Sequence, residues 1–158
     1  MALEIERRFL VKENYTPSDP ASGVPMRACY LLADGGATIR VRLEGDKAVM
    51  TLKQRNSAVE RTEFEYPVPF EDALHIITHF PKIGEVVEKV RYTEFVNGTE
   101  WVVDIFAGAN SPLCIAEVEL DDAGREIVIP EWAAAEITGD DSYSNAALAM
   151  QPYSLRGQ

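Results

Sequence analysis

The most distinctive feature of the sequence is a set of like-charged residues separated by a single residue. Neighbouring carboxylates are oxygen ligands of the kind that hard divalent cations prefer, whereas clustered basic side chains bind polyanions. Five such pairs lie along the chain: Glu4 and Glu6, Arg40 and Arg42, Glu63 and Glu65, Lys89 and Arg91, and Glu117 and Glu119. Cation-binding and polyanion-binding chemistry therefore occupies separate segments.

An i, i+2 spacing places both members of a pair on one face of a β-strand, since side chains alternate between the faces. The residue between the members of every pair is apolar, as Ile5 is in the opening stretch EIERRFLV. In that stretch one face carries Glu4, Glu6 and Arg8, and the face that a core could cover carries Leu3, Ile5 and Phe9. The charged faces point either to water or into an interior.

The energetics of like charges constrain this choice. Residues two apart on a strand are separated by about 7 Å. At that distance like charges repel by about 0.6 kcal/mol in water and by about 2.4 kcal/mol at an effective dielectric constant of about 20. Five uncompensated pairs inside a protein would cost on the order of 12 kcal/mol, comparable with the stability of a whole domain. An interior lining therefore requires counter-charges and ligands.

The chain holds nearly balanced counter-charges for such a lining. The basic set is Arg8, Arg40, Arg42, Lys53, Lys89 and Arg91, and the acidic set is Glu4, Glu6, Glu63, Glu65, Asp104, Glu117 and Glu119. The alternative is a sheet with one solvated face, on which acidic and basic strands pair crosswise. Segregation of the two signs onto different segments favours the interior lining.

Composition limits the classes of partner. The 158 residues are 46% hydrophobic and carry a net charge of −11, which disfavours broad electrostatic binding to nucleic acid or an anionic membrane. No apolar run reaches the roughly 20 residues of a membrane span, and we expect a cytoplasmic protein. Cys29 and Cys114 have no CxxC partner, so we expect reduced thiols without a disulfide or zinc site. One domain over residues 1–158 is expected.

Apolar alternation and turn residues predict an antiparallel β protein. The expected strands are 3–11, 26–33, 37–43, 47–55, 59–68, 86–96, 99–106 and 113–120. Asn97 and Gly98 give the clearest hairpin signal. Helical spacing predicts helices at 70–80 and 142–153, with a loop at 13–25. Eight antiparallel strands with few helices indicate a closed barrel or a sandwich.

The same segments resemble a known family. EIERRFLV resembles the N-terminal ExExK signature of the CYTH family, the triphosphate tunnel metalloenzymes, and in particular its compact bacterial members. The similarity continues through ATIRVRLEGDKAVMTLK, RTEFEYPVP, EKVRY, WVVDIFAG, AEVEL and TGDDSYSNAALA. It implies a mainly β (α+β) fold: an eight-stranded antiparallel closed barrel with a few peripheral helices. Members of the family bind triphosphates with Mg²⁺ or Mn²⁺ inside the barrel.

Site residues follow from the resemblance position by position. The implied triphosphate-binding residues are Arg8, Arg40, Arg42, Lys53, Lys89 and Arg91, with Tyr30 as either a phosphate donor or an aromatic packing residue. The implied metal-binding residues are Glu4, Glu6, Asp104, Glu117 and Glu119, supported by Glu63 and Glu65. We assign catalytic roles to Arg8, Glu6 and Lys53, and expect two divalent ions.

The function predicted is divalent-metal-dependent hydrolysis of a triphosphate by in-line attack of water on a terminal phosphoryl group. Inorganic tripolyphosphate is the preferred substrate, with thiamine triphosphate and nucleoside triphosphates as further candidates. The family signature ends in lysine, whereas this chain has Arg8, which stays charged and is a poor proton carrier. A second hypothesis is therefore a non-catalytic nucleotide- or polyphosphate-binding module, and a third is an adenylate cyclase. The expected partner is a small triphosphate, and a homodimer is left open.

Overall fold

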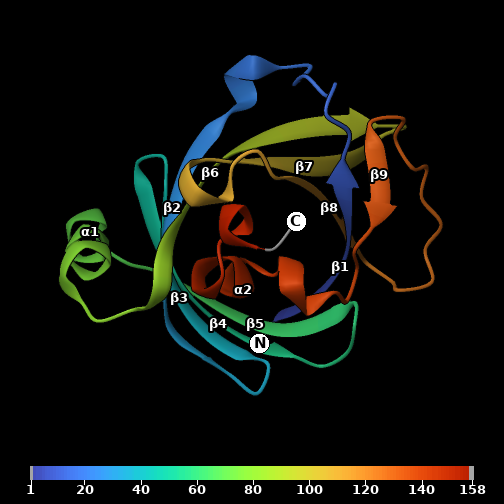
Figure 1. The fold of residues 1–158 in the computed structure, drawn as a ribbon. Coiled ribbons are helices and arrows are strands. Elements are labelled where there is room, and N and C mark those ends of the chain that lie inside the picture. Colours follow the sequence, from blue (N-terminus) through green and yellow to red (C-terminus); the bar gives the residue numbers. More distant parts are fainter. Residues whose placement is uncertain (1, 157–158) are drawn as a thin grey trace.

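Eight antiparallel strands form a closed barrel in the computed structural model, which describes residues 2–156 (Figure 1). Sheet order runs β5-β4-β3-β2-β6-β7-β8-β1, and pairing of β5 with β1 closes the ring. The barrel strands are β1 (Ala2–Val11), β2 (Val24–Asp34), β3 (Ala37–Glu44), β4 (Lys47–Arg55), β5 (Glu60–Pro67), β6 (Ile83–Val96), β7 (Thr99–Phe106) and β8 (Cys114–Leu120). The predicted barrel is confirmed, and every predicted strand is present with ends that differ by at most a few residues.

A ninth strand, which the sequence analysis missed, covers part of β1. Strand β1 pairs with β8 through residues 5–10 along one edge, but with β5 only through residues 2–5 along the other. β9 (Ala133–Glu136) pairs with Phe9 and Val11 on the edge that β5 leaves free. Its sequence AAAE is short and lacks apolar alternation, so only the free edge of β1 makes it a strand.

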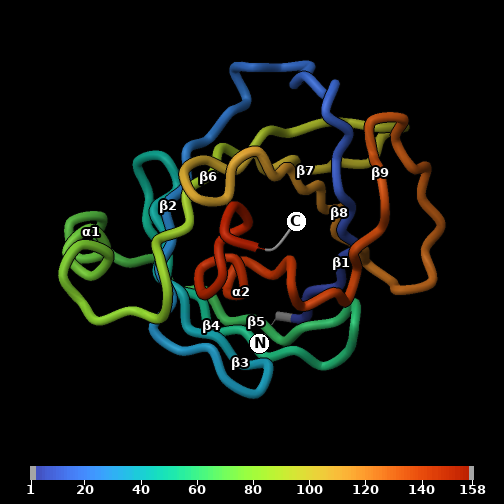
Figure 2. Tube along the Cα trace, in the orientation of Figure 1, coloured from blue at the N-terminus to red at the C-terminus, as the bar shows by residue number. Residues whose placement is uncertain are grey.

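The two helices have different positions relative to the barrel. Helix α1 (Phe70–His79) packs on the outside, against β3 and β4, and carries His75 and His79 away from the barrel interior. Helix α2 (Asn145–Met150) contacts β6 and β2, and the C-terminal segment lies over one barrel opening (Figures 1 and 2). Neither helix is long and apolar enough to cross a membrane, within the described residues.

The predicted continuous helix at 142–153 is wrong in its extent. Ser144 caps α2, its hydroxyl accepting a hydrogen bond from the amide of Ala147, and separates the helix from a short 3₁₀ turn at Asp141–Tyr143. Pro152 precedes a second 3₁₀ turn at Tyr153–Leu155. Proline and an N-cap serine both interrupt a helix, so three short elements replace one.

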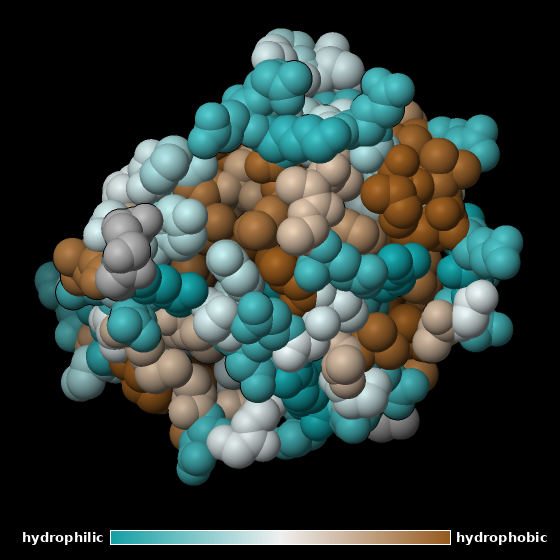
Figure 3. All heavy atoms as spheres, turned by 45° about the vertical axis from the view of Figure 1, so that its right-hand side comes forward, coloured by the Kyte–Doolittle hydropathy of each residue, from teal (hydrophilic) through white to brown (hydrophobic). Residues whose placement is uncertain are grey.

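Much of the apolar core lies outside the barrel wall. One cluster, centred on Val41 and Ile77, packs between the strands and α1. A second joins Phe9 and Trp101 beneath the chain that follows β8. The third includes Tyr30 and Leu148 and packs around α2. Figure 3 shows one outer face, where apolar residues gather in patches between hydrophilic ones.

One predicted core position is wrong. Leu3 is 54% exposed, whereas Ile5 and Phe9 on the same face of β1 are buried. Leu3 lies where β1 pairs with β5, outside the cluster that covers Ile5 and Phe9. Alternation therefore predicts which way a side chain points, but the elements that cover it decide whether it is buried.

Trp101 tests the importance of this outer core. Its ring is fully buried and lies 5.5 Å from the ring of Phe9 and 5.7 Å from that of Trp132. We expect Trp101→Ala to lower the free energy of unfolding by about 3–5 kcal/mol, because it removes a large buried side chain and leaves a cavity. Urea unfolding followed by circular dichroism measures the loss.

The control is Phe95→Ala, since Phe95 belongs to the adjacent strand β6 but is 72% exposed. Its expected effect is within about 0.5 kcal/mol. Equal losses in the two variants would contradict the assignment of Trp101 to a closely packed core.

Candidate active site

A cavity of about 750 Å³ occupies the barrel interior, and charged side chains line it. All five of the like-charged pairs contribute to its wall, as do Arg8 and Lys53. The lining therefore contains these predicted site residues: Glu4, Glu6, Arg8, Tyr30, Arg40, Arg42, Lys53, Glu63, Glu65, Lys89, Arg91, Glu117 and Glu119. The prediction that the charged faces line an interior is therefore confirmed, and the alternative of a sheet with one solvated charged face is wrong.

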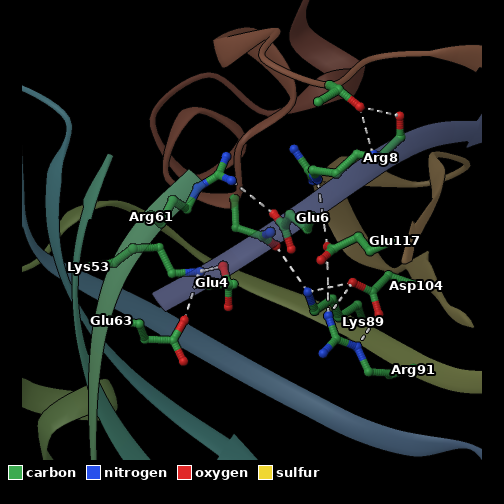
Figure 4. A network of polar contacts seen from close by, with 12 residues as sticks. Glu4, Glu6, Arg8, Lys53, Arg61, Glu63, Lys89, Arg91, Asp104 and Glu117 are labelled. Atoms are coloured by element: carbon green, nitrogen blue, oxygen red, sulfur yellow. Dashed lines mark hydrogen bonds and ion pairs between the residues drawn. The ribbon is translucent and has the colours of Figure 1, made fainter. Parts of the chain in front are cut away.

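Acidic and basic side chains compensate one another across this cavity (Figure 4). Lys53 Nζ lies 3.0 Å from Glu4 Oε1 and 3.3 Å from Glu63 Oε2, so one ammonium joins strands β4, β1 and β5. Arg42 pairs with Glu44, and Arg40 donates to the Thr51 hydroxyl at 3.2 Å. This internal pairing supplies part of the counter-charge that an inward-facing set requires.

Asp104 anchors the basic residues of β6. Its carboxylate is 1% exposed and accepts a hydrogen bond from Lys89 Nζ at 2.7 Å. Arg91 donates a two-pronged pair to the same carboxylate, at 2.7 and 2.9 Å. Burial lowers the pKa of Lys89 to about 8, although Asp104 opposes the shift. Asp104, predicted as a metal-binding residue, therefore does not line the cavity but lies behind the two bases and holds them in position.

The carboxylates nearest β1 are crowded. Burial and the neighbouring Glu117 raise the pKa of Glu6 to about 8. Burial also raises the pKa of Glu4 and of Glu119, and nearby acidic side chains add to both shifts. Burial opposes ionisation of Glu117 too, but Arg8 and Arg91 outweigh it and hold its pKa well below the usual range. Neighbouring carboxyl groups hinder one another's ionisation, and a bound divalent cation would relieve the repulsion between their ionised forms.

The donor set therefore fits a divalent cation in chemistry. Glu4, Glu6 and Glu119 offer carboxylate oxygens. Glu63 and Glu117 interact electrostatically with this set, since Glu63 helps to raise the pKa of Glu4 and both help to raise that of Glu119. Within residues 2–156 no three His, Cys, Asp or Glu side chains already converge as a metal-binding group. Binding of a cation would consequently require Glu4 and Glu6 to exchange their present basic partners.

Several guanidinium nitrogens in the cavity wall lack hydrogen-bond acceptors in the described part of the chain. Burial covers Nε and Nη2 of Arg8, Nε of Arg40, Nε of Arg42 and Nη1 of Arg61, and in the described part of the chain none finds a hydrogen-bond acceptor. Buried donors without acceptors are unfavourable, and a phosphate chain would supply several oxygens to accept from them. This set fits a polyanion, as the sequence analysis expected.

Two predicted residues lie at the margins of the site. Glu65 is exposed, although its side chain reaches the cavity wall. Tyr30 is buried in the cluster around α2 and also lines the cavity, so packing and cavity lining both describe it.

Arg61 and Asn145 were missed by the sequence analysis. Arg61 lies on the cavity face of β5, and Asn145 in α2 accepts a hydrogen bond from Lys89 Nζ at 3.2 Å. Arg61 is two residues before Glu63 and therefore points to the same face of the strand, so its direction could have been predicted from the sequence. A search for like-charged pairs misses it, because the residue two positions along the chain is acidic. Asn145 carries no comparable signal.

Comparison with known proteins agrees with this geometry. The CYTH domain profile matches residues 2–145. An inorganic triphosphatase from Acetivibrio thermocellus is 37% identical over 153 residues, which cover 97% of this chain and 97% of that protein. An inorganic triphosphatase from Nitrosomonas europaea is 35% identical over 156 residues, covering 93% of this chain and 97% of that protein.

A solved structure shares the fold as well as the sequence. The crystal structure of the inorganic triphosphatase NE1496 superposes with a TM-score of 0.67 at 34% identity, covering 93% of this chain and 97% of that one. The chain belongs to the CYTH domain family, and the resemblance drawn from its sequence motifs is confirmed.

Glu6 makes the stability of the metal-free protein depend on pH. Its pKa of about 8 in the folded chain lies above the ordinary 4.5, so the folded state binds this proton more tightly than the unfolded state. The stabilising contribution is complete below pH 4.5 and is lost as the pH rises toward 8. We expect Glu6→Gln, which does not titrate, to gain stability relative to wild type across that window.

Urea unfolding in EDTA at about pH 5 and about pH 9 measures this difference. The expected result is a variant that is clearly more stable than wild type at the higher pH only. A difference of the same size at both pH values would contradict the raised pKa of Glu6.

Proposed function

We propose that this chain is a divalent-metal-dependent triphosphatase that hydrolyses inorganic triphosphate. The observation that carries the proposal is one cavity in which unpartnered guanidinium donors face crowded carboxylates. The donors match the oxygens of a phosphate chain, and the carboxylates match hard cations. Relatives at 35–37% identity that are inorganic triphosphatases support the same conclusion.

The proposed mechanism rests on positioning and charge. Arg40, Arg42, Lys89 and Arg91 bind the phosphate chain, with Lys89 and Arg91 held in place by Asp104. Arg8, whose Nε and Nη2 have no hydrogen-bond acceptor, donates to the phosphoryl group under attack and stabilises its developing charge. Water attacks the terminal phosphorus, the bridging P–O bond breaks, and orthophosphate and diphosphate leave.

The proposed cation site consists of Glu4, Glu6 and Glu119, supported by Glu63 and Glu117. Two Mg²⁺ or Mn²⁺ ions are proposed, and such ions neutralise phosphate charge and acidify a bound water. Lys53 remains charged, because Glu4 and other nearby carboxylates outweigh the effect of burial and raise its pKa. Its proposed role is electrostatic: it supports the carboxylates without carrying a proton.

The surroundings proposed for the enzyme follow from the same features. Residues 1–158 would act as one tunnel domain, since the chain after β9 packs back onto the barrel. Its net charge of −11 supports a small anionic substrate bound locally, without a nucleic acid or membrane partner. Two free cysteines, Cys29 and Cys114, fit a reducing cytoplasmic location.

A screen for phosphate release tests the proposed function. Wild-type protein is incubated with tripolyphosphate, thiamine triphosphate or ATP, with Mg²⁺, with Mn²⁺ or with EDTA. We expect the fastest release from tripolyphosphate, because the cavity wall is rich in basic donors for phosphate oxygens and has few groups that would bind a nucleoside. We expect release with either cation and none in EDTA, because the proposed reaction needs a divalent ion.

The same screen separates the alternatives. Binding of tripolyphosphate without phosphate release, restored to turnover by Arg8→Lys, would contradict the enzyme and favour a binding module. Cyclic AMP and diphosphate from ATP, without orthophosphate, would indicate a cyclase.

A further inference from the structure

Arg61 lies inside the barrel where β1 and β5 close it. Its Cα pairs with Glu4 on β1 and with Arg55 on β4, and its side chain is 12% exposed on the cavity wall. The nearest charged partner is Glu6, whose Oε1 lies 3.3 Å from Arg61 Nη1. That nitrogen is buried and makes no hydrogen bond within the described chain, so the contact is electrostatic without being well aligned.

Other arginines of this chain show how a purely structural guanidinium is held. Arg7 on the outside of β1 donates to Glu136 from two nitrogens, at 2.9 and 2.7 Å. Arg91 forms the same two-pronged arrangement with Asp104. Arg61 has no such arrangement. Its single loose contact leaves donors available, although burial makes unused donors unfavourable.

Arg8 shares this condition beside the same carboxylate. Among residues 2–156 its buried Nε and Nη2 find no hydrogen-bond acceptor, and its side chain makes one ion pair, with Glu117 at 3.7 Å. In Figure 4 the head groups of Arg61 and Arg8 lie on either side of Glu6, having come from different strands. Two guanidinium groups with buried nitrogens that lack hydrogen-bond acceptors therefore flank the position of the Glu6 carboxyl group in the cavity.

We propose that Arg61 is a further phosphate-binding residue. Together with Arg8 it donates hydrogen bonds to the phosphoryl group that lies beside Glu6 when a triphosphate is bound. The inference rests on the proposed function and adds a β5 residue to a proposed phosphate-binding set otherwise drawn from β1, β3 and β6. Before substrate enters, Arg61 Nη1 contacts the Glu6 carboxyl group. Phosphate oxygens then replace that contact and release Glu6 for the cation site.

Calorimetric titration of tripolyphosphate in EDTA tests the proposal without turnover. We expect Arg61→Gln to weaken binding by about tenfold or more, since it removes hydrogen bonds to a charged group. Arg61→Lys, which keeps the charge but loses the planar fork, should give an intermediate affinity. The matched control is Arg27→Gln, which removes the same charge from a 45% exposed side chain outside the cavity and should stay within about twofold.

Glu6→Gln distinguishes direct contact from mere neutralisation of Glu6. If Arg61 binds phosphate itself, Arg61→Gln weakens binding by a similar factor in the Glu6→Gln background. If Arg61 acts only through Glu6, its substitution has no effect in that background, and this result would overturn the inference. Equal affinities of Arg61→Gln and Arg27→Gln would overturn it too.

Folding and the underlying function are controlled in the same series. The double variant with Arg61→Gln and Glu6→Gln removes both partners of the contact, and Arg61→Lys keeps the charge. If Arg61→Gln alone fails to fold, the affinity of either of these variants still tests the inference. A wild-type protein that neither binds nor hydrolyses tripolyphosphate would overturn the proposed function, and this inference with it. Binding by wild type with no loss in the variants overturns the inference alone.

Discussion

Electrostatic compensation inside the barrel is the constraint on which the rest of this structure depends. Strand alternation turns the charged faces inward, so much of the apolar surface faces outward and must be covered there. Helix α1 covers one part of the outer wall, and the chain around Trp132 covers another. A protein of this design buries apolar side chains on the outside of its barrel in order to keep a polar cavity within it.

The compensating contacts fall into two kinds. Asp104 holds Lys89 and Arg91 through short, well-aligned hydrogen bonds, which fix the bases before any ligand arrives. Arg8 and Arg61 make only longer contacts with Glu117 and Glu6, and keep unused donors. Fixed contacts preorganise the cavity, whereas loose contacts can be exchanged for a phosphate chain and a cation at little cost in lost hydrogen bonds.

Strand alternation and turn residues were enough to predict the barrel strands and to place Glu4 and Glu6 on one face, whereas their inward direction followed from the segregation of the two signs and the family resemblance. They could not reveal β9, because AAAE becomes a strand only through the free edge of β1. Nor could they predict which acid pairs with which base, since Lys53 meets Glu4 and Glu63 only after three strands come together. Arg61 had a readable direction but no like-charged neighbour to mark it.

The most direct test of the account is a crystal structure of the protein with tripolyphosphate and Mn²⁺, in which anomalous scattering locates the metal. We expect Mn²⁺ beside Glu4, Glu6 and Glu119, and phosphate oxygens on the cavity arginine nitrogens that have no hydrogen-bond acceptor in the free protein. Metal and phosphate bound only on the outer surface, with the internal ion pairs unchanged, would contradict it.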